Sequence, residues 1–190
     1  MLIYLSSLKF LSENKMYFSD HTLGELPLKF VQRIGALDNS RLLESSVAVF
    51  EYLRELFGSS HNYVYAIMSE VPMHFIEYAW RALKREVKMN YLVSYNAVLP
   101  RKRHIESEHS IFQELLKMSQ LQRRMAEQVQ VNLVMNETRA IVVFPNLKGR
   151  TDFNFGFYNV DQVFHDWCYD CFDYRWQDSK PYDSKKLFEV

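Results

Sequence analysis

The clearest pattern along the chain is a strand, a helix and a second strand between residues 62 and 95. Residues 62–68 (NYVYAIM) are aromatic and largely apolar, as in a buried strand. Pro72 suits the first turn of a helix, and apolar residues then recur every three or four positions. They are Met73, Ile76, Trp80, Leu83 and Val87. Residues 88–95 (KMNYLVSY) follow as a strand. This order predicts a right-handed βαβ crossover with two parallel strands.

Strict alternation predicts an antiparallel hairpin in the second half of the chain. In residues 128–135 (QVQVNLVM) every second side chain is apolar, as in a half-buried strand. These side chains are Val129, Val131, Leu133 and Met135. After the turn NET, residues 139–144 (RAIVVF) supply the return strand. Residues 153–158 (FNFGFY) alternate around Gly156 and add a further strand.

Helical periodicity covers most of the first 60 residues. Residues 1–20 predict a helical arm, with leucines at every third position that end before Gly24. These leucines are Leu2, Leu5, Leu8 and Leu11. A short helix is expected after Pro27. The segment ALDNS then offers capping residues for a long helix that ends at Gly58. Its apolar stripe is Leu43, Val47, Phe50, Leu53 and Phe57.

Two more helices are expected beyond the crossover. Ser110 and Gln113 have the spacing of a capping box and open a helix that runs through Leu121. Residues 159–179 predict a helix with one aromatic and one acidic face. Its inward residues are Phe164, Trp167, Cys171 and Tyr174, and its outward residues are Asp166, Asp170 and Asp173.

These elements predict an α/β fold with a mixed sheet of about five strands, flanked by helices. The sheet contains the parallel βαβ unit and the antiparallel hairpin. We expect an N-terminal helical arm at residues 1–20, a single α/β ligand-sensing domain at residues 21–180 and a tail at residues 181–190.

Composition places the chain among globular proteins and argues against direct DNA binding. Hydrophobic residues make up 48% of the 190 residues and charged residues 24%. The 23 basic and 23 acidic residues cancel, so the basic excess that drives binding to a phosphate backbone is missing. The N-terminal apolar run is far shorter than the roughly 18 residues of a membrane span, and no cleavage site follows it. We therefore expect a cytoplasmic protein with no membrane contact.

Cysteine and histidine patterns give little support for catalysis or metal binding. Cys168 and Cys171 have C-x-x-C spacing, but they lie two turns inside a helix instead of at its N-terminus. His104 and His109 flank Glu106 and Glu108 without the fixed spacing of a metal site. The basic segment PRKRH (residues 100–104) has acidic neighbours, which favours a solvated loop. We expect packing cysteines, no metal, no cofactor and no catalytic residues.

Two stretches resemble a known family. Residues 19–44 (SDHTLGELPLKFVQRIGALDNSRLLE) resemble the entry to the C-terminal sensor domain of archaeal winged-helix transcription regulators of the methanogenesis-regulator type. Residues 131–176 resemble the ending of that domain, with a hairpin, a glycine loop and a Trp-bearing helix. The matching positions are Pro27, Arg33, Ile34, Leu37, Gly149, Trp167, Phe172, Tyr174 and Trp176. The resemblance implies a ligand-sensing or dimerising domain that ordinarily follows a winged helix.

Only residues 1–18 precede the resemblance, which is too few for a winged helix. We therefore expect DNA contact only through a winged-helix domain or partner outside this chain. The same family is distantly similar in fold to phospholipase D, whose catalytic pattern is H-x-K-x-x-x-x-D. Gln130, Asn132 and Glu137 have that spacing without those chemistries. Glutamine cannot attack phosphorus, and asparagine cannot supply a cation, so we expect a phospholipase-D-like fold without the catalytic motif.

The sequence thus predicts a non-catalytic, small-ligand-sensing and dimerisation domain of an archaeal-type transcription regulator. We expect it to form a homodimer and to bind a small-molecule effector. Two alternatives stay open: a degenerate or unrecognised phosphodiesterase or nuclease of the phospholipase D type, and a pure dimerisation module. Thermal stabilisation by a metabolite separates the sensor from both.

The expected ligand site lies where the two parallel strands end, because open α/β sheets leave a crevice at their carboxyl edge. Ser69 and Tyr95 end those strands, and the aromatic segment 153–176 can wall an apolar pocket. Asn132 belongs to the polar face of the strand at residues 128–135. Arg139 opens the return strand and could neutralise a carboxylate or phosphate on the ligand.

Overall fold

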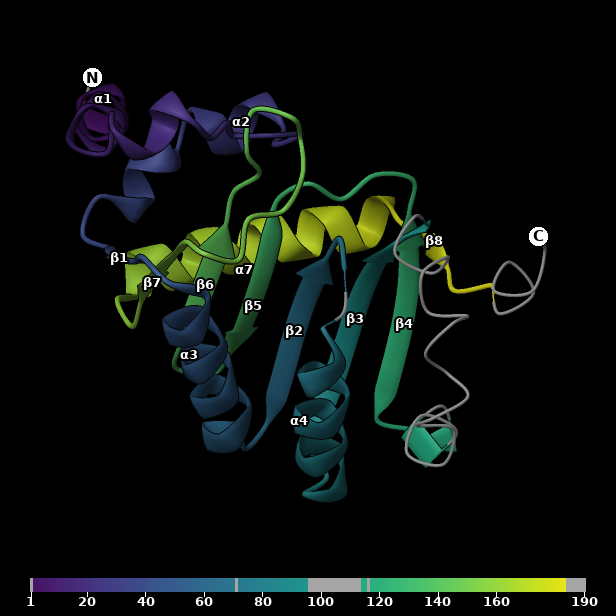
Figure 1. The fold of residues 1–190 in the computed structure, drawn as a ribbon. Coiled ribbons are helices and arrows are strands. Elements are labelled where there is room, and N and C mark those ends of the chain that lie inside the picture. Colours follow the sequence, from purple (N-terminus) through teal and green to yellow (C-terminus); the bar gives the residue numbers. More distant parts are fainter. Residues whose placement is uncertain (1, 71, 96–113, 116, 184–190) are drawn as a thin grey trace.

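The computed structural model describes residues 2–70, 72–95, 114–115 and 117–183 (Figure 1). In this part of the chain, one mixed sheet of eight strands has the order β1-β7-β6-β5-β2-β3-β4-β8. The strands are β1 Arg41–Leu43, β2 Tyr63–Met68, β3 Lys88–Ser94, β4 Leu121–Ala126, β5 Asn132–Asn136, β6 Ala140–Val143, β7 Gly156–Asn159 and β8 Lys180–Pro181. The α/β class and the mixed sheet are confirmed, whereas the expected number of about five strands was too low.

The predicted βαβ unit forms the centre of the sheet. Strands β2 and β3 are parallel, and they are in register from Tyr63 opposite Lys88 to Met68 opposite Val93. Helix α4 (Met73–Lys84) joins them, and its N-cap is Pro72. Strand β4 continues the parallel pairing on the far side of β3.

The predicted hairpin is also present. Strands β5 and β6 are antiparallel, with Asn132 opposite Val143, and β5 runs antiparallel to β2. The regular strand is shorter than the alternating segment 128–135. The predicted half burial was wrong, because Asn132 and Val134 on the other face are buried as well. All four predicted apolar residues, Val129, Val131, Leu133 and Met135, are buried in the same hydrophobic cluster.

Helices cover both faces of the sheet (Figure 1). Helices α3 (Ser46–Ser59) and α4 pack on one face of the sheet and form one hydrophobic cluster with it. The other face packs with α1 (Leu2–Glu13), α2 (Leu28–Val31), the 3₁₀ helices η1 (Tyr17–Ser19) and η2 (Ile34–Leu37), and α7 (Gln162–Asp178). The two clusters bury the sheet on both sides, so every residue of β5 and β6 is buried, and all of them except the two asparagines of β5 are apolar.

Helix α7 closes the second cluster. Its N-cap Asp161 accepts hydrogen bonds from the backbone N–H groups of Val163 and Phe164. Trp167 is fully buried, and its indole N–H donates to the Phe30 carbonyl at 3.3 Å. The predicted inward position of Tyr174 was wrong: this side chain is 38% exposed, and Phe172 is buried instead.

The N-terminal segment is docked on the second cluster, but with a different face from the predicted one. Leu5 and Leu8 are 56% and 64% exposed, whereas Phe10 is fully buried. The side chain of Ser7 accepts a hydrogen bond from the Gly35 N–H at 3.1 Å. A Cβ at Gly35 would lie 2.5 Å from the Ser6 carbonyl carbon, so only glycine permits this approach of α1 to η2.

Two predicted helices lose residues to strands. Leu43 lies in the edge strand β1, and α3 begins only after Ser45, whose side chain accepts from the Ala48 N–H. Leu121 starts β4 instead of ending a helix, because residues 121–126 pair with β3. Sheet pairing between distant segments overrides local helical periodicity at both places.

Some expectations fall on segments outside the described residues. They are the basic segment 100–104, the cluster of His104, Glu106, Glu108 and His109, the start of the helix expected from Ser110, and residues 184–190 of the tail. None of the helices in the described part of the chain is long and apolar enough to cross a bilayer.

Candidate functional site

The edge of the sheet where β2, β3 and β4 end is the candidate functional site. These strands are parallel, so their carboxyl ends meet at one edge. Strand β5 is antiparallel to β2, with Ile67 opposite Leu133, so its beginning lies at the same edge. This topology brings Ser69, Tyr95 and Asn132 to a common edge, as the sequence predicted.

Asn132 links three segments of this edge. Its side-chain carbonyl accepts from the Ser69 N–H at 2.7 Å and from the Ser69 hydroxyl at 3.1 Å. Its amide group donates to the Thr151 hydroxyl at 3.0 Å and to the Gln130 carbonyl at 3.3 Å. The Ser69 and Thr151 hydroxyls also contact each other. Asn132 is only 2% exposed, so its hydrogen-bonding groups serve the fold.

Arg139 lies at the opposite edge. It precedes β6, and the hairpin register puts Met135 opposite Ala140 while Asn132 lies opposite Val143. The guanidinium of Arg139 donates to the Glu55 carboxylate on α3 at 2.9 Å. The hypothesis that Arg139 shares a site with Asn132 was therefore wrong, because the full length of β5 separates them.

The residues with the phospholipase D spacing do not converge either. Glu137 lies in the β5–β6 turn and accepts from the backbone N–H groups of His61, at 2.6 Å, and Asn62. Burial alone would raise the pKa of Glu137, but backbone N–H donors outweigh it and hold this pKa below the ordinary value. Gln130 and Asn132 lie at the other end of β5. The Glu137 carboxylate therefore binds backbone N–H groups and does not share a site with Gln130 and Asn132.

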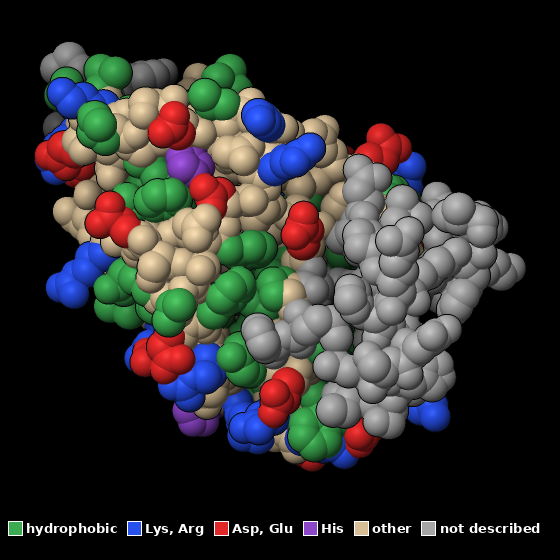
Figure 2. Space-filling view, viewed as in Figure 1, with side chains coloured by type: hydrophobic (Ala, Val, Ile, Leu, Met, Phe, Trp, Pro, Cys, Tyr) green, Lys and Arg blue, Asp and Glu red, His purple; other side chains and the backbone are tan. Residues whose placement is uncertain are grey.

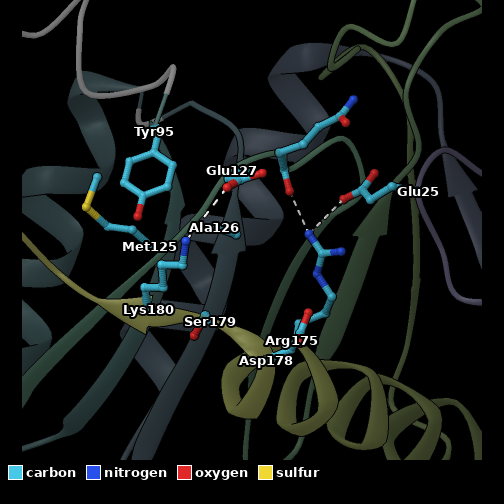
Figure 3. A pocket seen from close by; sticks show the side chains of 10 residues that line it. Glu25, Tyr95, Met125, Ala126, Glu127, Arg175, Asp178, Ser179 and Lys180 are labelled. Atoms are coloured by element: carbon cyan, nitrogen blue, oxygen red, sulfur yellow. Dashed lines mark hydrogen bonds and ion pairs between the residues drawn. The ribbon is translucent and has the colours of Figure 1, made fainter.

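A cleft of about 350 Å³ opens at the candidate edge beside Tyr95 (Figure 3). The ends of β4 and α7, the strand β8 and the segment before α2 form its walls. The lining residues are Glu25, Tyr95, Met125, Ala126, Glu127, Gln128, Arg175, Asp178, Ser179 and Lys180. Of the four predicted site residues, only Tyr95 lines this cleft.

Two ion pairs of different character lie in the cleft. Arg175 donates to the Gln128 carbonyl at 2.7 Å and to the Glu25 carboxylate at 3.3 Å, and both side chains are less than one-fifth exposed. Glu25 also accepts from the Gln130 N–H at 2.8 Å, which ties it to the approach to β5. Lys180 lies 3.7 Å from Glu127, and both side chains are largely exposed. An exposed pair of this kind is weak, so an anionic ligand could displace Glu127 from Lys180.

Sequence reasoning missed Arg175, Glu25 and Lys180. Glu25 and Arg175 are 150 residues apart, and no short motif contains both. The resemblance named Tyr174 and Trp176, the two neighbours of Arg175, but assigned nothing to the arginine itself. Only the packing of α7 across the sheet brings these charges together.

The two cysteines pack in the core. Burial raises the pKa of Cys168 well above its ordinary value and raises that of Cys171 to about 12. Both thiols are buried in the cluster beneath α7 and are therefore protonated at neutral pH. No group of three or more His, Cys, Asp or Glu side chains in the described ranges is placed to hold a metal ion.

No protein-family model matches the sequence, and no curated protein is significantly similar to it. Among solved structures, Nuc from Salmonella typhimurium, a phospholipase D family member, matches with a TM-score of 0.50 and 9% identity. The match covers 71% of this chain and 91% of that chain. The fold is phospholipase-D-like. This likeness confirms the fold expected from the sequence.

A second similar structure is that of TrmBL2, an archaeal chromatin protein with a novel mode of DNA binding. The TM-score is 0.61 and the identity is 15%, over 75% of this chain. The matched part spans 54% of the TrmBL2 chain, so this chain corresponds to about half of that protein. The fold expected from the resemblance is thus shared with an archaeal chromatin protein.

Proposed function

We propose that this chain is a small-ligand-sensing domain of an archaeal-type transcription regulator, acting in the cytoplasm as a homodimer and without catalysis. The observation that carries the proposal is the cleft beside Tyr95 on a fold shared with an archaeal chromatin protein. Its volume of about 350 Å³ lies within the range of small-molecule sites. Contact with DNA would come from a winged-helix domain or partner outside this chain.

The charges of the cleft suit a small ligand with an anionic group. Lys180 can turn from Glu127 to the ligand, Tyr95 offers an aromatic wall, and Arg175 supplies a second cation. Arg175 also holds Glu25, which lies just before α2. A ligand that competes for Arg175 would loosen the tie between α7 and the N-terminal segment. Such a ligand shifts the domain only if it binds one of the two arrangements better.

A thermal-shift screen with small carboxylates and phosphorylated metabolites tests the proposal. A ligand present at 100 times its Kd stabilises the folded state by about 2.7 kcal/mol. We expect Lys180→Gln to weaken the response, because it removes an exposed cation from the cleft. Lys88→Gln is the matched control, since Lys88 begins β3 at the opposite edge and is exposed. Equal responses in the two variants would place the ligand elsewhere.

The alternatives predict different outcomes in the same preparation. Steady turnover of a phosphodiester such as bis(p-nitrophenyl) phosphate would favour the phosphodiesterase, despite Gln130 and Asn132 in place of a nucleophile and a cation. A dimer in analytical ultracentrifugation that no metabolite stabilises would favour the dimerisation module. A monomer at all concentrations would contradict the homodimer.

A further inference from the structure

A second cavity opens between α3 and α4, at the edge of the sheet opposite the Tyr95 cleft. Its volume is about 360 Å³. It lies where α3 ends before β2 and where α4 ends before β3, so it adjoins the amino ends of the parallel strands. The side chains that line it are Arg54, Phe57, Glu77, Tyr78, Arg81 and Arg85. We propose that this cavity binds a phosphate-bearing ligand.

Three guanidinium groups from two facing helices meet at this cavity. Arg54 on α3 pairs with Glu51, three residues before it, and its Nε donates at 2.9 Å. Arg81 on α4 pairs with Glu77, four residues before it, at 2.6 Å. All four side chains are about half exposed or more, so water competes for both pairs. A phosphate group can replace either glutamate because each pair is local and weak.

Arg85 supplies the third cation. Its Nη2 donates to the Phe57 carbonyl at 2.7 Å and to the Gly58 and Ser60 carbonyls at 3.4 Å. These partners are neutral groups at the end of α3, so this arginine neutralises no carboxylate among them. Glu55 also attracts Arg54, but it is itself paired with Arg139. Three arginines therefore face Glu51 and Glu77 around the cavity, which leaves a surplus of positive charge. In Figure 2, Lys and Arg side chains lie among Asp and Glu side chains at the lower end of this face.

The geometry of guanidinium groups selects phosphate over a simple halide. A guanidinium is a planar fork of N–H donors that matches two phosphate oxygens at once. Arg54 and Arg81 stand on different helices, so a single phosphate or a short polyphosphate chain could bridge them.

The apolar wall of the cavity indicates a planar ring on the ligand. Tyr78 is partly exposed, and its ring centroid is 6.3 Å from that of the buried Phe57. A partly exposed tyrosine ring such as that of Tyr78 can stack on a nucleobase. Phosphates and a stacked ring occur together in nucleoside phosphates and in single-stranded nucleic acid, and the phosphate chemistry is common to both.

Isothermal titration calorimetry at low ionic strength tests the site, with ATP, tripolyphosphate, adenosine and a single-stranded oligonucleotide as probes. We expect wild-type protein to bind the phosphate-bearing probes. The double variant Arg54→Gln/Arg81→Gln should weaken this binding by about tenfold or more, since it removes two charge-assisted contacts. Arg85 is left intact because it caps α3.

Arg33→Gln is the matched control, because Arg33 is a similarly exposed arginine that pairs with Asp170 on α7. Helix α7 packs on the face of the sheet opposite to α3 and α4. Lys180→Gln should leave binding at the α3–α4 cavity unchanged. Loss of phosphate binding in Lys180→Gln but not in Arg54→Gln/Arg81→Gln would place the phosphate in the Tyr95 cleft and overturn the proposal. Tighter binding of ATP than of tripolyphosphate identifies a nucleotide, and tightest binding of the oligonucleotide identifies nucleic acid. No binding of any phosphate probe, equal loss in Arg33→Gln, or adenosine binding as well as ATP would overturn the proposal.

Discussion

Asn132 shows how a polar residue in a strand can serve the fold instead of a ligand. It is nearly fully buried and bonds the end of β2 and Thr151 to the start of β5. We expect Asn132→Ala to lower the free energy of unfolding by about 1–3 kcal/mol, because the Ser69 N–H loses its partner. Urea denaturation measures the change. Asn154→Ala, at an exposed asparagine, should stay within about 0.5 kcal/mol of wild type.

The buried thiols make the protein sensitive to alkali. Burial raises the pKa of Cys168 and raises that of Cys171 to about 12, whereas an unfolded thiol has a pKa of about 8.5. The unfolded state therefore releases these protons first, and stability falls as pH rises from about 8.5 towards 12.

The cysteine variant isolates this effect. Between pH 7.5 and pH 10, we expect Cys168→Ala/Cys171→Ala to lose less unfolding free energy than wild type, although it starts less stable. Denaturant titrations at both pH values measure the two differences. Identical losses would mean that the thiols do not contribute. A stoichiometric metal in protein purified without chelator would contradict their packing role.

Among the elements, α7 depends on its N-terminal cap. Asp161 accepts two backbone N–H groups of the first turn, and α7 covers one hydrophobic cluster of the sheet. We expect Asp161→Ala to cost about 1 kcal/mol of unfolding free energy. Asp166→Ala is the control, because this exposed residue within α7 accepts a hydrogen bond from Gln162 in the preceding turn, and its loss should cost about a few tenths of a kcal/mol. Thermal unfolding followed by circular dichroism compares the two variants, and equal losses would contradict the capping role.

For the whole molecule, the net charge determines how strongly the chain binds double-stranded DNA. The net charge is zero, and the arginines around the α3–α4 cavity have glutamate neighbours. We therefore expect weak binding to double-stranded DNA, with an affinity that falls as salt increases. A gel-shift assay at physiological salt checks this. Sub-micromolar, sequence-specific binding would show that the chain contains a DNA-reading surface of its own.

The parts of the fold that the sequence determined are those in which neighbouring elements pair. The βαβ unit around α4 joins two strands through one short crossover, and the β5–β6 hairpin turns on three residues. In both, hydrophobic periodicity identifies the elements, and the short connection dictates how they pair. The common edge of Ser69, Tyr95 and Asn132 follows from the same two units.

The tertiary structure alone decided the partners that are distant in sequence. Leu43 and Leu121 leave predicted helices because β1 pairs with β7 and β4 pairs with β3. Arg139 pairs with Glu55 because the hairpin register places Arg139 at the far edge of the sheet. Glu25 pairs with Arg175, which is 150 residues away in the sequence. Local periodicity shows which face of an element is buried, but not which distant segment covers it. Which distant segments pack together depends on burial and strand pairing summed over the whole sheet. The positions of both cavities therefore follow only from the tertiary structure.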